Sequence, residues 1–204
     1  MILTIGDSFT YGEELADRIT CAWPYLLPQP VLNLGKPASS IDRIFRVAIE
    51  ETLKEKYDIV IVAWSFPNRL EVCENKNPVC INFNNRKKLP WVDDYYKYSY
   101  DEDFSFQKWF TQVISLQNHF KQINQQYIFC NVAGLQGYYI KYKDKLDFLL
   151  KNIDTTYYPG WPLNGMLEWQ GDCPKGPGGH PLEVGHQRIS EKINEHIRNL
   201  GWLS

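Results

Sequence analysis

The apolar run Tyr57-Asp-Ile-Val-Ile-Val-Ala63 constrains the fold of this chain more than any other segment. After Asp58 it is continuously apolar and mostly β-branched. A strand of that composition is buried on both faces, as in a parallel sheet that helices cover on each side. The run therefore predicts a central strand of an α/β protein.

Shorter strand patterns alternate with helical ones along the rest of the chain. Strands are predicted at 1–5, 31–34, 127–132 and, more weakly, 155–158. Apolar residues at three- and four-residue spacing predict helices over about 39–56, 105–125, 138–151 and 182–200. This alternation predicts a three-layer α/β/α fold with a doubly wound, flavodoxin-like parallel sheet of about five strands.

The helix predicted over 39–56 carries its own start signal. Ser39 or Ser40 is placed to cap its first turn. Asp42 and Arg46 are spaced for an i,i+4 ion pair on its polar side.

The length of 204 residues predicts one domain spanning 1–204. Residues 66–104 interrupt the alternation, because they are rich in Asn, Lys, Asp and Tyr and contain three prolines. A segment of that length within a compact domain is typical of a lid, a binding loop or an inserted subdomain. We therefore expect an insertion at about 66–104.

Charge and hydropathy exclude several classes of partner. A net charge of −2 gives no drive toward nucleic acid or an anionic membrane. The sequence shows neither a signal peptide nor a membrane-spanning run, so a cytoplasmic protein is expected. Its five scattered cysteines then predict reduced thiols, although Cys73 and Cys80 are spaced to close a small loop or hold a metal. The sequence leaves the oligomeric state open.

Two short segments near the ends of the chain carry the chemistry. Gly6-Asp7-Ser8 follows the first predicted strand, and Gly178-Gly179-His180-Pro181 precedes the last predicted helix. In a doubly wound sheet both lie beyond the carboxyl ends of the strands, where ligands bind. A serine hydroxyl is a poor nucleophile until an imidazole takes its proton. The pair therefore indicates transfer or hydrolysis of an acyl group.

With two further segments, these residues resemble the four sequence blocks of the SGNH/GDSL hydrolases. The four segments are Gly6-Asp7-Ser8, Asn33-Leu34-Gly35, Asn68 and His180-Pro181. The resemblance implies that Ser8 is the nucleophile and His180 its general base. It also implies an oxyanion site made by the Ser8 and Gly35 N–H groups and the Asn68 side chain. The absence of a Cβ at Gly35 suits close approach of the backbone.

Two positions depart from the family pattern. The third block reads Trp64-Ser-Phe-Pro-Asn-Arg69, with Phe66 in place of the family's glycine and Arg69 in place of its acid. Pro177 stands where the family has an aspartate three residues before the histidine.

The acid that orients His180 is therefore open. Asp172 is the nearest carboxylate upstream and Glu183 the nearest downstream. A backbone carbonyl in place of an acid would leave a Ser–His dyad, which we favour slightly. Asp172 is retained as the candidate acid.

Other polar residues admit structural and functional interpretations. Asp7 is expected to order the nucleophile turn through backbone hydrogen bonds. Arg69 is placed to bind substrate or to form a salt bridge with Glu71. His186 is expected to be a structural histidine at the start of the last helix.

A metal site could be formed by Asp172, Cys173, His180 and His186. This alternative is less favoured, because the glycines and prolines between these residues suit a hydrolase loop equally well. The sequence thus predicts a serine esterase without metal or organic cofactor, acting through an acyl-Ser8 intermediate on a small acyl ester such as an O-acetyl group on a carbohydrate. The alternatives are a non-catalytic carbohydrate-binding or structural module on the same fold, and an O-acyltransferase.

Overall fold

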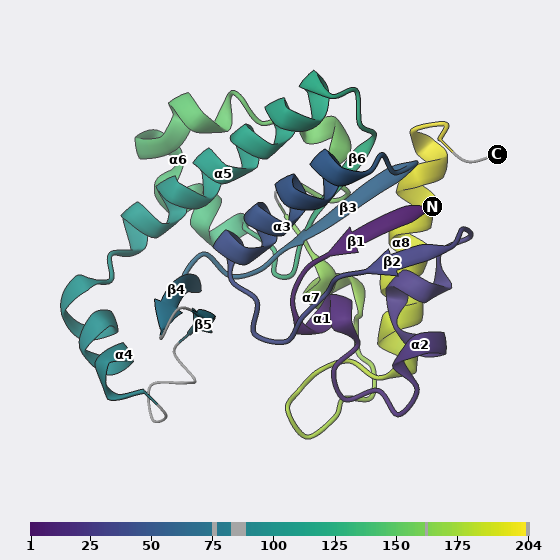
Figure 1. The fold of residues 1–204 in the computed structure, drawn as a ribbon, viewed down its shortest axis with the longest axis horizontal. Helices are drawn as coiled ribbons and strands as arrows, with labels where there is room; N and C mark the ends of the chain where they lie inside the picture. The colour runs from purple at the N-terminus through teal and green to yellow at the C-terminus, as the bar shows by residue number, and fades with distance from the viewer. Residues whose placement is uncertain (75–76, 83–88, 162, 203–204) are drawn as a thin grey trace.

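The computed structural model describes residues 1–74, 77–82, 89–161 and 163–202. These residues form a main sheet of four parallel strands in the order β2-β1-β3-β6 (Figure 1). The strands are β1 (Ile2–Ile5), β2 (Val31–Asn33), β3 (Ile59–Trp64) and β6 (Tyr127–Asn131). Because all four run the same way, their carboxyl ends meet at one edge of the sheet.

Alternate residues of the central strands point into two separate cores. In β3, Val60 and Val62 belong to one core, and Ile59 and Ile61 to the other. All six residues of β3 are buried. This confirms the central strand and the covered sheet that the apolar run predicts.

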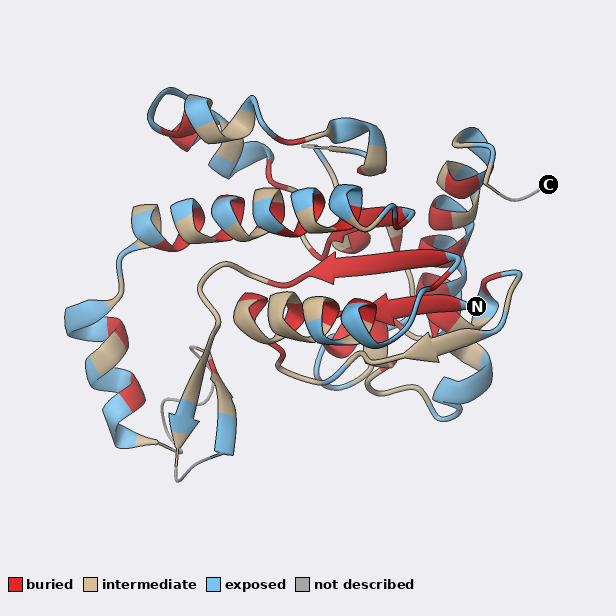
Figure 2. Ribbon diagram, turned by 45° about the horizontal axis from the view of Figure 1, so that its top comes forward, coloured by how far each residue is buried: buried red, intermediate tan, exposed pale blue. Residues whose placement is uncertain are grey.

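Helices form the two outer layers. The first core is closed by α3 (Ile41–Lys54), α5 (Glu102–Gln122) and α6 (Gln136–Leu150). The second is closed by α7 (Met166–Trp169) and α8 (Glu183–Asn199). Figure 2 shows the buried side of α5 turned toward the sheet and its exposed side turned away. The three-layer α/β/α architecture is confirmed.

Local signals place the start of α3 correctly but not its ion pair. Ser40 is the N-cap, and its hydroxyl accepts a hydrogen bond from the Arg43 N–H at 3.2 Å. The Asp42 carboxylate contacts Lys108 and Gln112 of α5 instead of Arg46. Partners from α5 replace the predicted i,i+4 contact because Asp42 faces the neighbouring helix.

The weak strand predicted at 155–158 is wrong. The described main sheet ends at β6, and Thr155–Tyr157 form a 3-10 turn, η4. The Asp154 carboxylate caps this turn by accepting the Thr156 N–H. Tyr158 is buried against Phe129, so aromatic packing explains the apolar pattern that resembles a strand.

The segment predicted as an insertion contains structure of its own. An antiparallel pair, β4 (Leu70–Glu74) and β5 (Asn77–Ile81), is followed by α4 (Pro90–Asp94) and the π-helical turn η3 (Tyr95–Ser99). They share a small core built around Ile81, Val92 and Tyr96. Figure 1 shows these elements beside the carboxyl end of β3, away from α8.

Two contacts tie this segment to α3. The Glu71 carboxylate pairs with Arg46 at 2.9 Å, and the Glu71 N–H donates to Asp42 at 3.0 Å. Cys73 and Cys80 lie on opposite strands of the hairpin, and neither forms a disulfide.

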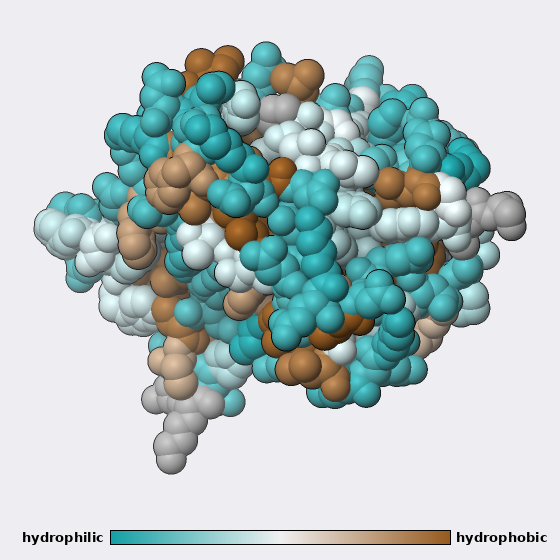
Figure 3. All heavy atoms as spheres, turned by 90° about the horizontal axis from the view of Figure 1, so that it is seen from above, coloured by the Kyte–Doolittle hydropathy of each residue, from teal (hydrophilic) through white to brown (hydrophobic). Residues whose placement is uncertain are grey.

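The surface is mainly hydrophilic on the face seen in Figure 3, where apolar side chains form separate patches among polar ones. Of the helices that the structure describes, none combines the length and the apolar character that crossing a membrane requires.

Candidate active site

Ser8 lies where β1 gives way to a short helix at the carboxyl edge of the sheet. Helix α1 (Ser8–Tyr11) begins at Ser8 itself, and Asp7 is its N-cap. The Asp7 carboxylate accepts the Phe9 N–H at 3.1 Å, so Asp7 orders this turn as expected. Ser8 is only 5% exposed, and its Oγ forms no hydrogen bond within the described ranges. The turn thus presents a shielded hydroxyl that is unpaired among the residues the structure describes.

A buried ion pair between Arg69 and Asp7 stabilises the turn. Arg69 and Ser65 each donate to Asp7 Oδ2 at 3.0 Å. Arg69 also donates to Ser65 Oγ at 2.9 Å and lies over the Phe66 ring. Burial raises the pKa of Asp7 above its ordinary value, and the Arg69 guanidinium acts in the opposite direction. Leaving either charge unpaired here would cost several kcal/mol, about 3–5 in comparable buried pairs.

This geometry corrects the interpretation of Arg69. Its guanidinium is committed to Asp7 and Ser65 rather than pointing to substrate, and its side chain is 16% exposed. The alternative Arg69–Glu71 salt bridge is wrong as well, because Glu71 pairs with Arg46. The sequence suggested a local ion pair between Arg69 and Glu71. In the structure the ion-pair partner of each residue comes from a distant element: Asp7 for Arg69 and Arg46 for Glu71.

Gly35 follows β2 and lies against α1. A Cβ at this position would stand 2.6 Å from the Tyr11 backbone nitrogen, so the close backbone approach does require glycine. Its N–H donates to Asn33 Oδ1 at 2.9 Å, while Asn33 Nδ2 donates to the Thr10 carbonyl at 2.8 Å. An oxyanion would therefore have to displace Asn33 Oδ1 from the Gly35 N–H.

Asn68 lies two residues before the start of β4, in the loop that leaves β3. Its backbone carbonyl accepts the Tyr96 hydroxyl at 2.7 Å. The 66–104 segment thus fixes the backbone at Asn68. The Asn68 side chain remains a candidate oxyanion donor on the strength of the sequence resemblance.

His180 sits in a tight loop that lies beside α1 in Figure 1. The Gly176 N–H donates to the His180 carbonyl at 3.0 Å, and Lys175 forms an isolated bridge with Pro181. The His180 ring packs on Phe9, the residue after Ser8, with ring centroids 5.6 Å apart. The structure therefore brings the serine turn and the histidine loop together, although Ser8 and His180 are 172 positions apart in the sequence.

A carboxylate contacts the His180 ring, but it is not the predicted one. Glu14 Oε2 lies 2.9 Å from His180 Nδ1 and accepts the His180 backbone N–H at 3.0 Å. Glu14 Oε1 accepts the Gly178 N–H at 2.5 Å. These backbone hydrogen bonds, led by that of Gly178, hold the pKa of Glu14 below its ordinary value.

The expectations for Asp172 and for a simple dyad are corrected by this contact. Asp172 is exposed, and its backbone carbonyl accepts a hydrogen bond from Arg188. The carboxylate comes instead from Glu14, six residues after Ser8. A second one, Glu13, has Oε2 3.5 Å from His180 Nε2. The sequence predictions considered only carboxylates close to His180 in the chain and therefore did not include Glu13 or Glu14. The position of these two glutamates shortly after the Ser8 turn is a signal that the sequence does contain.

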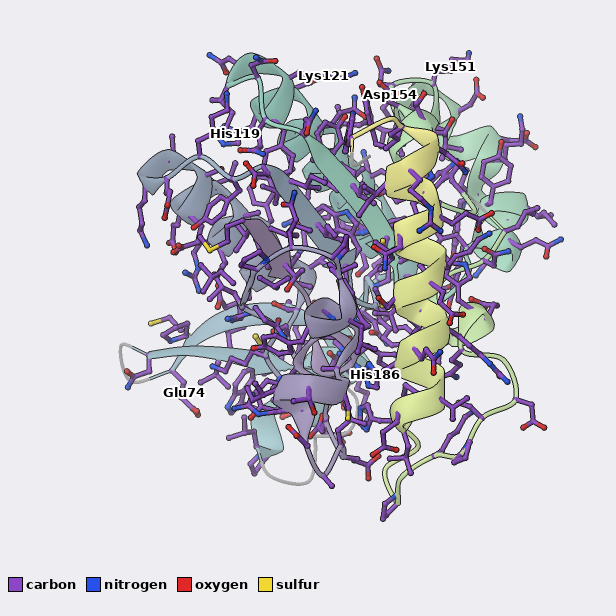
Figure 4. All side chains as sticks on the ribbon, turned by 90° about the vertical axis from the view of Figure 1, so that its right-hand side faces the viewer. Glu74, His119, Lys121, Lys151, Asp154 and His186 are labelled. Carbon is purple, nitrogen blue, oxygen red and sulfur yellow. The ribbon has the colours of Figure 1, made fainter. Side chains whose placement is uncertain are left out.

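His186 has the structural role that its position predicts. It is fully buried in α8, and its Nδ1 accepts the Trp23 N–H at 3.2 Å. Trp23 begins η1 (Trp23–Leu26), which follows α2 (Arg18–Cys21). Figure 4 shows His186 on the side of α8 that faces these N-terminal elements. Burial, assisted by the nearby His180, lowers the pKa of His186 to about 4.

The four-residue metal site considered from sequence is not assembled. His186 is turned to Trp23, whereas His180 is turned to Glu13 and Glu14. Over the described part of the chain, no group of three or more His, Cys, Asp and Glu side chains is placed to hold a metal ion.

The lowered pKa of His186 predicts a loss of stability in mild acid. The unfolded histidine binds a proton below about pH 6.5, whereas the folded one stays neutral down to about pH 4. The unfolded state therefore gains protons first, and the free energy of unfolding falls as the pH drops through this window. At pH 5 the loss from this residue is about 2 kcal/mol relative to pH 8.

Urea denaturation of the protein and of His186→Gln at both pH values checks this. Glutamine keeps an acceptor for the Trp23 N–H but does not titrate. The variant should therefore lose about 2 kcal/mol less than the parent on going from pH 8 to pH 5. Equal pH dependence of the two proteins would contradict the assignment.

Comparison with known proteins finds similarity in structure but not in sequence. No family model and no curated protein matches the chain. A G-D-S-L family lipolytic protein from Desulfitobacterium hafniense superimposes with a TM-score of 0.53 and 16% identity, over 96% of this chain and 98% of that one. A variant of an acetyl-xylooligosaccharide esterase from Geobacillus stearothermophilus gives 0.53 and 15%, over 96% and 93%. A family two carbohydrate esterase from Clostridium thermocellum, in complex with cellohexaose, gives 0.56 and 14%, over 99% of this chain and 65% of that one.

The chain therefore has the fold of the SGNH hydrolases, the class that its sequence blocks resemble. The solved proteins that it matches include GDSL lipolytic proteins and carbohydrate esterases.

Proposed function

We propose that this protein is a serine ester hydrolase in which Ser8 is the nucleophile and His180 the general acid and base. The observation that carries the proposal is the packing of the His180 ring on Phe9, the residue that directly follows the shielded Ser8. Fold similarity to esterases supports the class of reaction.

The proposed reaction has two steps. As Ser8 Oγ attacks the ester carbonyl carbon, its proton passes to His180 Nε2, and the same proton then goes to the departing alcohol. Water next attacks the acyl-Ser8 ester with His180 as base, which releases the acid and restores the serine. Glu13 must move away from Nε2 for this cycle to run, because its carboxylate is 3.5 Å from the nitrogen that receives the proton.

Oxyanion stabilisation is assigned to the Ser8 and Gly35 N–H groups and the Asn68 side chain. A preorganised donor of this kind is worth about 10²–10³ in rate. The Gly35 N–H is held by Asn33 Oδ1 in the structure, so we infer that the developing oxyanion replaces that acceptor.

The substrate is proposed to be a small acyl ester, such as an O-acetyl group on a carbohydrate. Two of the matched proteins are named as carbohydrate esterases, which supports this choice.

A fluorophosphonate probe and an acetyl ester test the proposal together. The folded protein should react with the probe at Ser8, located by peptide mass spectrometry, and should release acetate from a small activated acetyl ester and from an acetylated oligosaccharide. Urea-unfolded protein serves as the control for adventitious labelling. A folded protein that neither labels nor turns over either ester would favour the non-catalytic module. Acetyl transfer to an added sugar in preference to water would indicate the acyltransferase.

A further inference from the structure

The Glu14 carboxylate is held by the histidine loop at three points. One oxygen accepts the Gly178 N–H at 2.5 Å, and the other lies within 3.0 Å of both the backbone nitrogen and Nδ1 of His180. Two backbone contacts therefore fix the carboxylate relative to the residue whose ring it touches. Such an arrangement sets the orientation of the ring, and not only the path of the loop.

Two glycines of the histidine loop lie directly against the Glu14 carboxylate, where a side chain would be crowded. A Cβ at Gly176 would lie 2.7 Å from Glu14 Cδ, and one at Gly178 would lie 3.1 Å from both Glu14 carboxylate oxygens. Gly179 has φ +86°, but a Cβ there would meet nothing within 4 Å. Two of the three glycines before His180 are thus explained by contact with Glu14.

The backbone of Glu14 supports the same role. Its φ of +71° lies in the left-handed region, which is uncommon and costly for a residue with a Cβ. Such a conformation persists only where surrounding contacts hold it. Here those contacts are the hydrogen bonds to Gly178 and His180, so the strain is tied to the histidine loop.

We infer that Glu14 is the positioning acid of a Ser8–His180–Glu14 triad, supplied by the loop that carries the nucleophile rather than by the histidine loop. This inference rests on the proposed ester hydrolysis. Glu14 accepts the Nδ1–H of His180, which leaves Nε2 unprotonated and able to take the Ser8 proton. When the imidazolium forms, the carboxylate stays ionised and stabilises it. Pro177 occupies the position where the family has its acid. With Glu14 in that role, the histidine loop does not have to supply an acid of its own.

Glu14→Gln is the decisive variant. Glutamine can still accept the Gly178 N–H, but it carries no charge and does not select the ring tautomer. Loss of an orienting acid costs about 10⁴ in kcat in proteins with a working triad, so we expect kcat to fall about 10²–10⁴-fold with KM changed only a few-fold. Glu14→Asp should recover part of the lost rate.

Two matched carboxylate variants act as controls. Asp172→Asn, an exposed position in the same loop, should stay within about threefold of the parent. Glu13→Gln, on the other ring nitrogen and at a longer distance, should lose much less than Glu14→Gln. A loss below threefold in Glu14→Gln, or a loss in Asp172→Asn of the same size as in Glu14→Gln, would overturn the assignment.

A measurement on the unaltered protein keeps the inference testable if Glu14→Gln does not fold. Nitrogen-15 NMR of the histidine rings should show neutral His180 with its proton on Nδ1, and that proton should be strongly deshielded. A proton on Nε2 would overturn the role of Glu14. Because the tautomer is measured without turnover, this result stands apart from the esterase proposal, which fails only if Ser8 neither labels nor supports ester cleavage.

Discussion

Replacing Ser8 with alanine is expected to abolish ester turnover, with kcat falling by about 10⁶, the size of loss that removal of a catalytic serine produces. The reason is that no acyl-enzyme can form without Oγ. The fold should persist, because the lost hydroxyl makes no hydrogen bond within the described ranges. We expect the free energy of unfolding to change by no more than about 1 kcal/mol.

The measurement is kcat/KM on a small activated ester, together with urea denaturation of both proteins. The variant should also fail to react with the fluorophosphonate probe at this position. Turnover at the parent rate in a folded Ser8→Ala protein would show that another group is the nucleophile.

The two histidines near the site should respond to substitution in opposite ways. His180→Ala removes the proposed base, and we expect kcat to fall at least about 10³-fold with little change in stability. His186→Ala removes a fully buried ring and the acceptor for the Trp23 N–H. It should cost about 2–4 kcal/mol of stability, with a smaller effect on kcat in the protein that remains folded.

Comparing kcat with the urea midpoint for each variant separates the two roles. Exogenous imidazole offers a further check, because a small base can enter the space vacated by His180 and restore part of its rate. If His186→Ala instead loses kcat while keeping its stability, and His180→Ala does not, the base would be His186.

Much of the scaffold follows from local patterns. The apolar run that forms β3 predicts the buried central strand, and the hydroxyl of Ser40 predicts the start of α3. Both signals are local, since they depend on residues within one turn or one strand. The prediction at 155–158 is wrong because a β-branched and aromatic stretch can also pack as a turn. Here the Asp154 side chain caps that turn.

The candidate site was predictable only in part, for a related reason. Ser8 and His180 carry motifs, and the fold brings them together at the expected edge. No local pattern predicts the ionic partners of Arg69, Asp42 and His180, because each of these charged contacts joins residues far apart in the sequence. Glu14 and Gly178, for example, are 164 positions apart. Only the folded structure shows that the carboxylate in contact with His180 comes from another loop.

That separation has a consequence for how the site is made. His180 is synthesised 166 positions after Glu14, so the proposed site has no base until the histidine loop has been made. Strand β1 pairs with β2 and β3, and both of these strands precede the histidine loop in the sequence. The contact between Glu14 and residues 178–180 closes one of the longest loops in the molecule, and loop closure of that kind slows folding. If the proposed roles hold, a fragment that ends before the loop at 176–180 would contain the proposed nucleophile Ser8 and its neighbour Glu14, but no base to activate the serine.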